Sequence, residues 1–156
     1  MTNQGVVDAL KDLEIDFYRA QVGDKFISRE LVNKKLNLGG ETSGHIIQRE
    51  FSESGDANIA LIQTLAALEE LNMSLADIKE KINYKPQTLK SFNIKDTEII
   101  ETKEFNEQIK SLEKDYSNAR ISVRKSGTEP KIRVMIESDS EDNVANIMNS
   151  VESLIT

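Results

Sequence analysis

The sequence predicts a fold in two parts, an α/β segment followed by a small α+β unit. In the first part, runs with helical spacing of apolar residues alternate with short strand-like runs. In the second part, two strictly alternating runs are enclosed by runs with helical spacing. We place the boundary at Tyr84-Lys85-Pro86, because a proline disfavours helix at the residue before it. The predicted domains are therefore residues 1–85 and 86–156.

The first part begins with a helix, because Val6, Val7, Leu10 and Leu13 recur at helical spacing. Its next expected elements are a strand over 15–22, a helix over 26–35 that Asp24 or Ser28 could cap, and, within residues 36–47, two short strands around a glycine-rich loop. So few strands are little material for the core sheet of an α/β domain. We therefore expect this part to be an incomplete α/β segment.

Two further helices complete the first part. The first follows Ser54-Gly-Asp and runs to Leu71 with a broad apolar face, and we expect Asp56 to cap it. The second starts at Ser74 or Asn72.

The second part contains enough elements for a complete small unit. The apolar spacing predicts a strand over 89–94, a helix over 104–114, strands over 119–124 and 131–137, and a last helix over 140–154. We expect a small sheet covered by two helices.

The loop between the last two strands has the composition of an anion site. Alternation places Arg124 and Arg133 on the faces opposite the apolar residues, one at each end of the loop. Ser126 and Thr128 supply hydroxyls, and Gly127 can take a positive φ that turns backbone N–H groups toward one point. Guanidinium forks, hydroxyls and amides suit the oxygens of a phosphate. The alternative is a polar turn with two solvated arginines.

A second polar group occurs in the glycine-rich segment. Glu41, Ser43 and His45 occupy alternate positions, so an extended backbone would present all three on one side. A carboxylate, a hydroxyl and an imidazole suit the hydroxyls of a sugar and the ammonium group of an amino sugar. The alternative is a glycine hairpin with incidental polar residues, and a lone histidine is more often structural than catalytic.

Both loops resemble segments of one enzyme family, the phosphohexomutases. Residues 124–135, Arg-Lys-Ser-Gly-Thr-Glu-Pro-Lys-Ile-Arg-Val-Met, are similar to the phosphate loop of the family's last domain, in the branch that acts on glucosamine phosphates. Residues 39–47, Gly-Gly-Glu-Thr-Ser-Gly-His-Ile-Ile, resemble the sugar-recognition loop of its third domain, with Glu41 and Ser43 at the positions that hold the sugar hydroxyls. Lys25 stands where this branch usually has arginine, which makes it a weaker candidate.

The resemblance implies that the chain is the C-terminal part of such an enzyme, the end of the third domain followed by the fourth. The whole enzyme would interconvert glucosamine 6-phosphate and glucosamine 1-phosphate, in amino-sugar and cell-wall precursor synthesis. In the family, catalysis uses a phosphorylated serine of the first domain and a Mg²⁺ site of the second, and neither motif occurs in this chain. We therefore predict no catalytic or metal-binding residue here, and no activity of the chain alone.

Three functions remain open at this point. The chain could combine with a separate polypeptide that carries the first domains and bind a hexosamine phosphate substrate with it. It could instead be a phosphosugar-binding module without catalysis, or an inactive gene fragment.

Composition excludes several other classes. There are 27 acidic and 20 basic residues, a net charge of −7, so no basic field exists to attract nucleic acid or an anionic membrane. The absence of cysteine excludes disulfides and thiolate metal sites. Neither a long apolar run nor a signal peptide is evident, and we expect a soluble, cytoplasmic protein.

Overall fold

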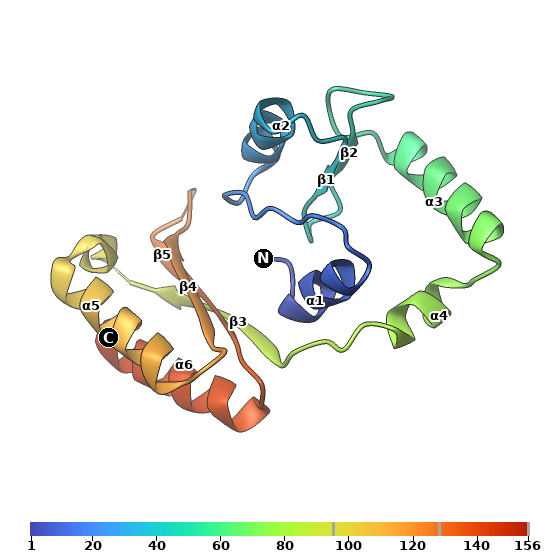
Figure 1. Cartoon of the computed structure of the whole chain (residues 1–156). Helices are drawn as coiled ribbons and strands as arrows, with labels where there is room; N and C mark the ends of the chain where they lie inside the picture. The colour runs from blue at the N-terminus through green and yellow to red at the C-terminus, as the bar shows by residue number, and fades with distance from the viewer. Residues whose placement is uncertain (95, 128, 156) are drawn as a thin grey trace. The chain divides into compact units, whose positions relative to one another are not determined.

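The computed structural model describes residues 1–94, 96–127 and 129–155. The chain forms two compact units, Met1–Asn83 and Tyr84–Thr156 (Figure 1). Each unit is described by itself. None of the helices in the described part of the chain has the length and apolar character needed to cross a bilayer.

The first unit combines four helices with a two-stranded antiparallel hairpin. In chain order the elements are α1 (Gln4–Asp12), α2 (Asp24–Asn33), β1 (Leu38–Gly40), β2 (Ile46–Gln48), α3 (Ala57–Leu71) and α4 (Leu75–Glu80). The strands β1 and β2 pair with Gly39 opposite Ile47. Helix α2 contacts β1, and α3 contacts β2.

Close packing of α2 on β1 requires a glycine at position 39. A Cβ atom there would lie 2.6 Å from the Cγ2 of Ile27, which is closer than real Cβ atoms approach, and 3.1 Å from the Cδ1 of Leu31, which is a tight contact. Because Gly39 has no side chain, Leu31 can be buried beside the hairpin. This packing holds the hairpin, and with it the turn that follows β1.

Helix ends in the first unit follow the sequence predictions in two of three cases. The Asp56 carboxylate accepts hydrogen bonds from the N–H groups of Asn58 and Ile59 and so caps α3. Ser74, rather than Asn72, caps α4 in a reciprocal capping box with Asp77. The prediction for α2 was wrong: Gly23 precedes the helix without a side-chain cap, and neither Asp24 nor Ser28 occupies that position.

The prediction of a strand over residues 15–22 is also wrong. These residues have no regular secondary structure, although their backbone is described throughout. A strand requires a neighbour for its backbone N–H and C=O groups. In this unit the described strands are β1 and β2, which pair only with each other. The β-type composition of this segment is therefore not enough to form a strand here.

The second unit has two layers, a three-stranded antiparallel sheet and a pair of helices (Figure 1). Its elements are β3 (Gln87–Asn93), the 3₁₀ helix η1 (Thr97–Glu101), α5 (Lys103–Asp115), β4 (Arg120–Lys125), β5 (Lys131–Glu137) and α6 (Glu141–Ile155). The strand order is β3-β5-β4, with β5 in the centre. The predicted arrangement of a small sheet covered by two helices is confirmed. The sequence did not predict η1.

The core of the second unit lies between the sheet and the helices. Alternate residues of the central strand, Ile132, Val134 and Ile136, are fully buried there. They join apolar side chains from β3, α5 and α6: Phe92, Phe105, Val144, Ile147, Met148, Val151 and Ile155. Ile121 and Val123 of β4 pack against the same core. The alternate residues Arg133, Met135 and Glu137 of β5 therefore point to the face of the sheet away from the helices, with their β4 partners Arg124, Ser122 and Arg120.

Candidate functional site

The β4–β5 hairpin places the two predicted arginines side by side. Arg124 and Arg133 are direct partners in the register of β4 and β5, and directly paired residues of antiparallel strands point to the same face. That face is the one away from α5 and α6, because Ile132 and Val134 point toward the helices. The arrangement is the one that the alternation in the sequence predicts.

The charges around this hairpin are divided between paired lysines and unpaired arginines. The Lys125 ammonium lies 2.6 Å from a carboxylate oxygen of Glu98 and 2.6 Å from one of Glu101. Lys131 and Glu129 form an ion pair of 2.8 Å, and Lys131 lowers the pKa of the Glu129 carboxyl, with a smaller effect from Arg133. Among the described residues, neither arginine side chain forms a hydrogen bond or ion pair. The described residues therefore leave the guanidinium donors of both arginines available.

The backbone of the loop is closed by two short hydrogen bonds. The Ser126 N–H donates to the Lys131 carbonyl, and the Lys131 N–H donates to the Glu129 carbonyl, both at 2.8 Å. The Ser126 Oγ is buried and has no hydrogen-bond partner within the described residues. A buried hydroxyl of this kind normally has a partner, so a ligand at the loop would satisfy it.

Gly127 does not have the positive φ that we expected of it. A Cβ atom at this position would meet nothing within 4 Å. The backbone conformation therefore does not require a glycine at this position. The absence of a side chain at Gly127 leaves open space next to Ser126. Thr128, the remaining predicted phosphate ligand, lies outside the described residues.

In the first unit, the turn between β1 and β2 brings Glu41, Ser43 and His45 together. The Ser43 hydroxyl donates to Glu41 Oε2 at 3.3 Å and lies 3.1 Å from His45 Nδ1. The single proton of the Ser43 hydroxyl is donated to Glu41. A simultaneous hydrogen bond between Ser43 and His45 therefore requires that Nδ1 of the imidazole carries a proton and donates it to the hydroxyl oxygen. The backbone is a turn rather than the extended chain that we expected, with Gly44 at φ 97°. The turn still gathers the three groups.

A backbone N–H that the sequence did not indicate fixes the carboxylate of Glu41. The Gly23 N–H donates to Glu41 Oε1 at 2.8 Å, which leaves Oε2 toward Ser43. The Lys25 ammonium lies 4.9 Å above the ring of its neighbour Phe26. Within the described residues it forms no hydrogen bond or ion pair with the turn. The segment that precedes α2 therefore reaches the turn through Gly23.

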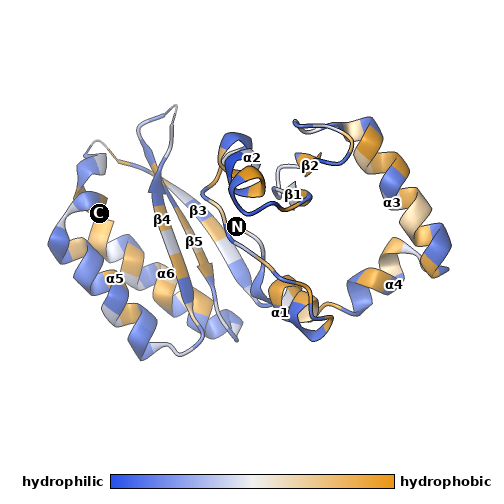
Figure 2. Cartoon of the chain, turned by 45° about the horizontal axis from the view of Figure 1, so that its top comes forward, coloured by the Kyte–Doolittle hydropathy of each residue, from blue (hydrophilic) through white to orange (hydrophobic). Residues whose placement is uncertain are grey.

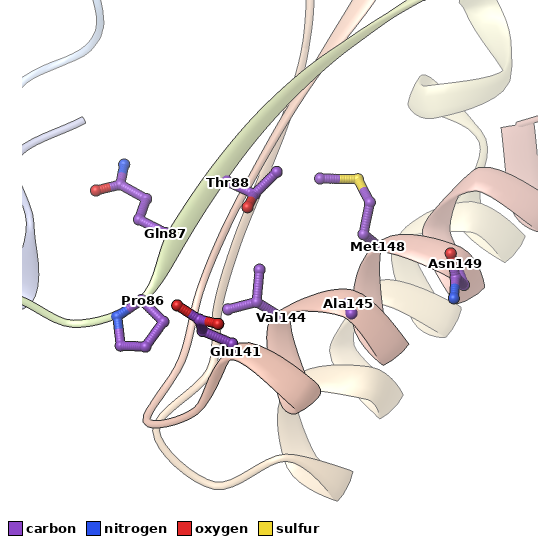
Figure 3. A pocket seen from close by; sticks show the side chains of 8 residues that line it. All are labelled: Pro86, Gln87, Thr88, Glu141, Val144, Ala145, Met148 and Asn149. Carbon is purple, nitrogen blue, oxygen red and sulfur yellow. The ribbon is translucent and has the colours of Figure 1, made fainter.

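The second unit also has a groove of about 390 Å³, which is distinct from the predicted phosphate loop. Its lining comes from the start of β3 and from α6: Pro86, Gln87, Thr88, Glu141, Val144, Ala145, Met148 and Asn149 (Figure 3). Gln87 pairs with Glu137 at one end of β5, whereas the loop joins the other end at Lys131. The groove and the loop are thus at opposite ends of the sheet.

The described residues do not include a cluster of three or more histidine, aspartate or glutamate side chains that could hold a metal ion. The donors present therefore do not fit a Mg²⁺ site of the kind that needs several carboxylate oxygens.

Two sequence models of the same family match the chain. The alpha/beta/alpha domain III of phosphoglucomutase/phosphomannomutase matches residues 1–84, and the C-terminal domain of that family matches residues 63–154. The chain belongs to the phosphoglucomutase/phosphomannomutase family. The resemblance of the two loops to phosphohexomutases is thereby confirmed.

Several curated relatives in this phosphohexomutase family are named phosphoglucosamine mutase. The chain is 37% identical over 155 residues to phosphoglucosamine mutase of Thermosipho africanus, and 40% identical over 146 residues to that of Pseudomonas paraeruginosa. These matches cover 99% and 92% of the chain but only 35% and 33% of the relatives. The chain therefore spans about a third of the length of these phosphohexomutases, and the domain models place it in their C-terminal part.

Solved phosphohexomutases share the fold. An N-acetylglucosamine-phosphate mutase in a substrate complex superposes with a TM-score of 0.84 at 23% identity, over 99% of this chain and 37% of that one. The N-acetylphosphoglucosamine mutase of Aspergillus fumigatus, in complex with GlcNAc-6P and magnesium, gives a TM-score of 0.81 at 15% identity, over 98% and 39%. At these identities the comparison establishes the fold.

Sequence reasoning missed the role of Lys125. It lies inside the predicted loop, but its partners are in a 3₁₀ helix that precedes it by more than twenty residues. The spacing of Glu98 and Glu101 was the available signal, because a 3₁₀ helix has three residues per turn and aligns them on one face.

Proposed function

We propose that this chain supplies the sugar-binding and phosphate-binding part of a phosphoglucosamine mutase, which interconverts glucosamine 6-phosphate and glucosamine 1-phosphate. Arg124, Ser126, Gly127, Thr128 and Arg133 hold the phosphate that is not reacting. Glu41, Ser43 and His45 hold the sugar, and Lys25 is the weaker candidate for a sugar contact. The phosphoserine and the Mg²⁺ ligands belong to the domains that this chain does not contain, so the chain is inactive alone.

One observation carries the proposal: two adjacent guanidinium groups on one sheet face, which form no hydrogen bond or ion pair among the described residues. Both lysines next to them are neutralised by carboxylates. An anion that enters this hairpin therefore meets two planar forks, which match the oxygens of a phosphate. The buried Ser126 hydroxyl adds one more group for the same ligand.

The turn in the first unit suits a hydroxylated, amino-bearing ligand. The Gly23 N–H and the Ser43 hydroxyl hold the Glu41 carboxylate in one orientation. A fixed carboxylate can accept hydrogen bonds from sugar hydroxyls and an ammonium group without losing side-chain entropy on binding. Relatives named phosphoglucosamine mutase and solved structures with hexosamine phosphates support an amino sugar as the substrate.

The contribution of these residues to the reaction is positioning. A substrate held at its sugar hydroxyls and its distal phosphate presents the other end to a phosphoryl donor in a fixed orientation. Such positioning can be worth several orders of magnitude in rate, but only where the donor is present. This chain therefore increases the rate only in combination with the missing domains.

Calorimetric titration of the chain with glucosamine 6-phosphate and with inorganic phosphate tests the binding site. The Arg133→Ala variant should weaken the binding of both by about 10- to 100-fold, as expected for loss of charge-assisted hydrogen bonds. Arg29→Ala, which removes an arginine from α2, is the matched control and should bind as the parent chain does. Equal affinity of Arg133→Ala and the parent chain would contradict the proposal.

A complementation assay tests the enzymatic part. A separate polypeptide with the serine loop and the aspartate cluster of the family should convert glucosamine 6-phosphate only when this chain is added. Failure of the mixture to turn over would reject the split enzyme.

The second candidate is a phosphosugar-binding module without catalysis. It is favoured by the unit Tyr84–Thr156, which has its own core and presents the unpaired arginines within one hairpin. Phosphosugar binding that depends on Arg133, together with no turnover in the mixture, would favour this candidate.

A further inference from the structure

Lys125 lies at the end of β4, directly before the loop, and it points away from the arginines. It is the register partner of Ile132, whose side chain is fully buried in the core under the helices. Arg124 and Arg133, one position away on each strand, point to the opposite face. The Lys125 ammonium therefore lies on the other side of the sheet from the two guanidinium groups.

On that side Lys125 joins β4 to η1. Its ammonium makes two ion pairs of 2.6 Å, with Glu98 and Glu101, which stack on one face of the 3₁₀ helix. The Lys125 side chain is only 29% exposed, whereas the two glutamates remain largely in solvent. Hydrogen bonding to Glu101, and then to Glu98, raises the pKa of Lys125, and Lys125 lowers the pKa of the Glu101 carboxyl.

These contacts act on the residue that opens the loop. Ser126 follows Lys125 directly, its N–H is bound to the Lys131 carbonyl, and its buried hydroxyl lacks a partner among the described residues. A strand end held at Lys125 fixes the directions of the Arg124 and Ser126 side chains on either side of it. Preorganised groups bind a ligand with less loss of conformational entropy.

We propose that Lys125 is a positioning residue for the phosphate loop, which acts through its ion pairs with Glu98 and Glu101 and does not contact the phosphate itself. The proposal rests on the proposed function, because it assumes that the loop between Arg124 and Arg133 binds phosphate. It adds Glu98 and Glu101, two acidic residues, to the groups on which anion binding depends.

Electrostatics alone and positioning predict opposite effects of removing the two carboxylates. Loss of two negative charges near an anion site should strengthen phosphate binding if only long-range charge matters. If the carboxylates hold Lys125 and the strand end, their loss should weaken binding although the unit becomes more positive.

The experiment compares inorganic phosphate binding by the full chain and its variants. Glu98→Gln combined with Glu101→Gln should weaken binding by about three- to tenfold, the scale of partly exposed ion pairs. The control is the double variant Glu104→Gln and Glu107→Gln, which removes two carboxylates from α5 and so changes the charge by the same amount. This control should bind phosphate at least as tightly as the parent chain does. Lys125→Gln should weaken binding, and Lys125→Arg, which keeps the ion pairs, should restore most of it.

Hydrogen exchange of the Ser126 amide gives a readout that does not need a ligand. This amide should exchange faster in the Glu98→Gln and Glu101→Gln double variant and at the parent rate in the control. Unchanged exchange together with equal or tighter phosphate binding would overturn the positioning role. If the parent chain did not bind phosphate, the proposed function would fail, and the exchange rates would still decide whether these ion pairs hold the loop.

Discussion

The two units of this chain differ in how much of their apolar surface they bury. In the described part of the first unit, three apolar residues are buried: Leu31, Ile47 and Ala60. The second unit has a contiguous buried cluster of ten, from Phe92 to Ile155. The units are of similar length, at Met1–Asn83 and Tyr84–Thr156. Burial of apolar surface is the main favourable contribution to folding, so most of the stability of the chain lies in the second unit.

Helix α3 shows the difference most clearly. Apolar residues run along most of it, and Leu61, Ile62 and Leu65 are all more than half exposed (Figure 2). A helix that is apolar on all sides is normally buried in a larger protein. The chain spans 35% of its Thermosipho africanus relative, and we expect α3 to be covered in a full-length protein of this family.

Separation of the two units should give the largest effect. A polypeptide of residues 84–156 should unfold cooperatively on heating, because its sheet and helices enclose one core. A polypeptide of residues 1–83 should bind hydrophobic dyes and lack a cooperative transition, because its apolar side chains remain exposed. Circular dichroism during heating and dye fluorescence measure both properties. A cooperative transition in residues 1–83 would remove the contrast between the units.

Single isoleucine substitutions sharpen the same comparison. Ile147→Ala in α6 should lower the free energy of unfolding by about 3 kcal/mol, since its side chain is 0% exposed and truncation leaves a cavity. Ile62→Ala in α3, where the side chain is 64% exposed, should change it by less than about 0.5 kcal/mol. Urea titration of both variants of the full chain gives the two values. A cost at Ile62 similar to that at Ile147 would show that α3 is covered in solution.

The sequence predicted the second unit better than the first, and the reason is local completeness. The alternation in β4 and β5 placed Arg124 and Arg133 on one face, because a one-residue shift would expose Ile132 and its neighbours. The strand partners and covering helices of this unit are all within the chain. The apolar pattern was therefore sufficient for the three strands and the two long helices of this unit, although it did not predict η1 or the conformation of Gly127.

The failures in the first unit have the opposite cause. Residues 15–22 have the composition of a strand but no partner strand in the described part of the unit. Glu41, Ser43 and His45 were expected on one side of an extended backbone, with a glycine hairpin as the alternative. In the structure they lie in a turn in which Gly44 takes a positive φ. The Gly23 N–H bond to Glu41 joins residues that are distant in sequence and follows no periodic pattern. Contacts of that kind require the fold.

The smallest effect that we expect is on how the stability of the folded chain changes with falling pH. The carboxyls with lowered pKa values differ in kind between the two units. In the second unit, Lys85 and then Asn118 lower the pKa of Asp139, and Lys125 lowers that of Glu101, so both carboxylates join segments distant in sequence. In the first unit, the Ser74 N–H lowers the pKa of Asp77 within a local capping box. A carboxyl with a lowered pKa stabilises the folded state above its ordinary pKa, and this stabilisation is lost as the pH falls through the folded value.

Acidification below about pH 4 should therefore weaken the contacts of Asp139 and Glu101 in the second unit, and in the first unit it should weaken the cap that Asp77 forms at the start of α4. Asp139→Asn should reduce the slope of stability against pH in that range, and Asp115→Asn, at the end of α5, is the control. Urea midpoints measured between pH 3 and 7, with near-ultraviolet circular dichroism of the tyrosines, report the change. An identical slope in Asp139→Asn and the parent chain would show that the contacts of Lys85 and Asn118 with Asp139 do not contribute to the stability of the second unit.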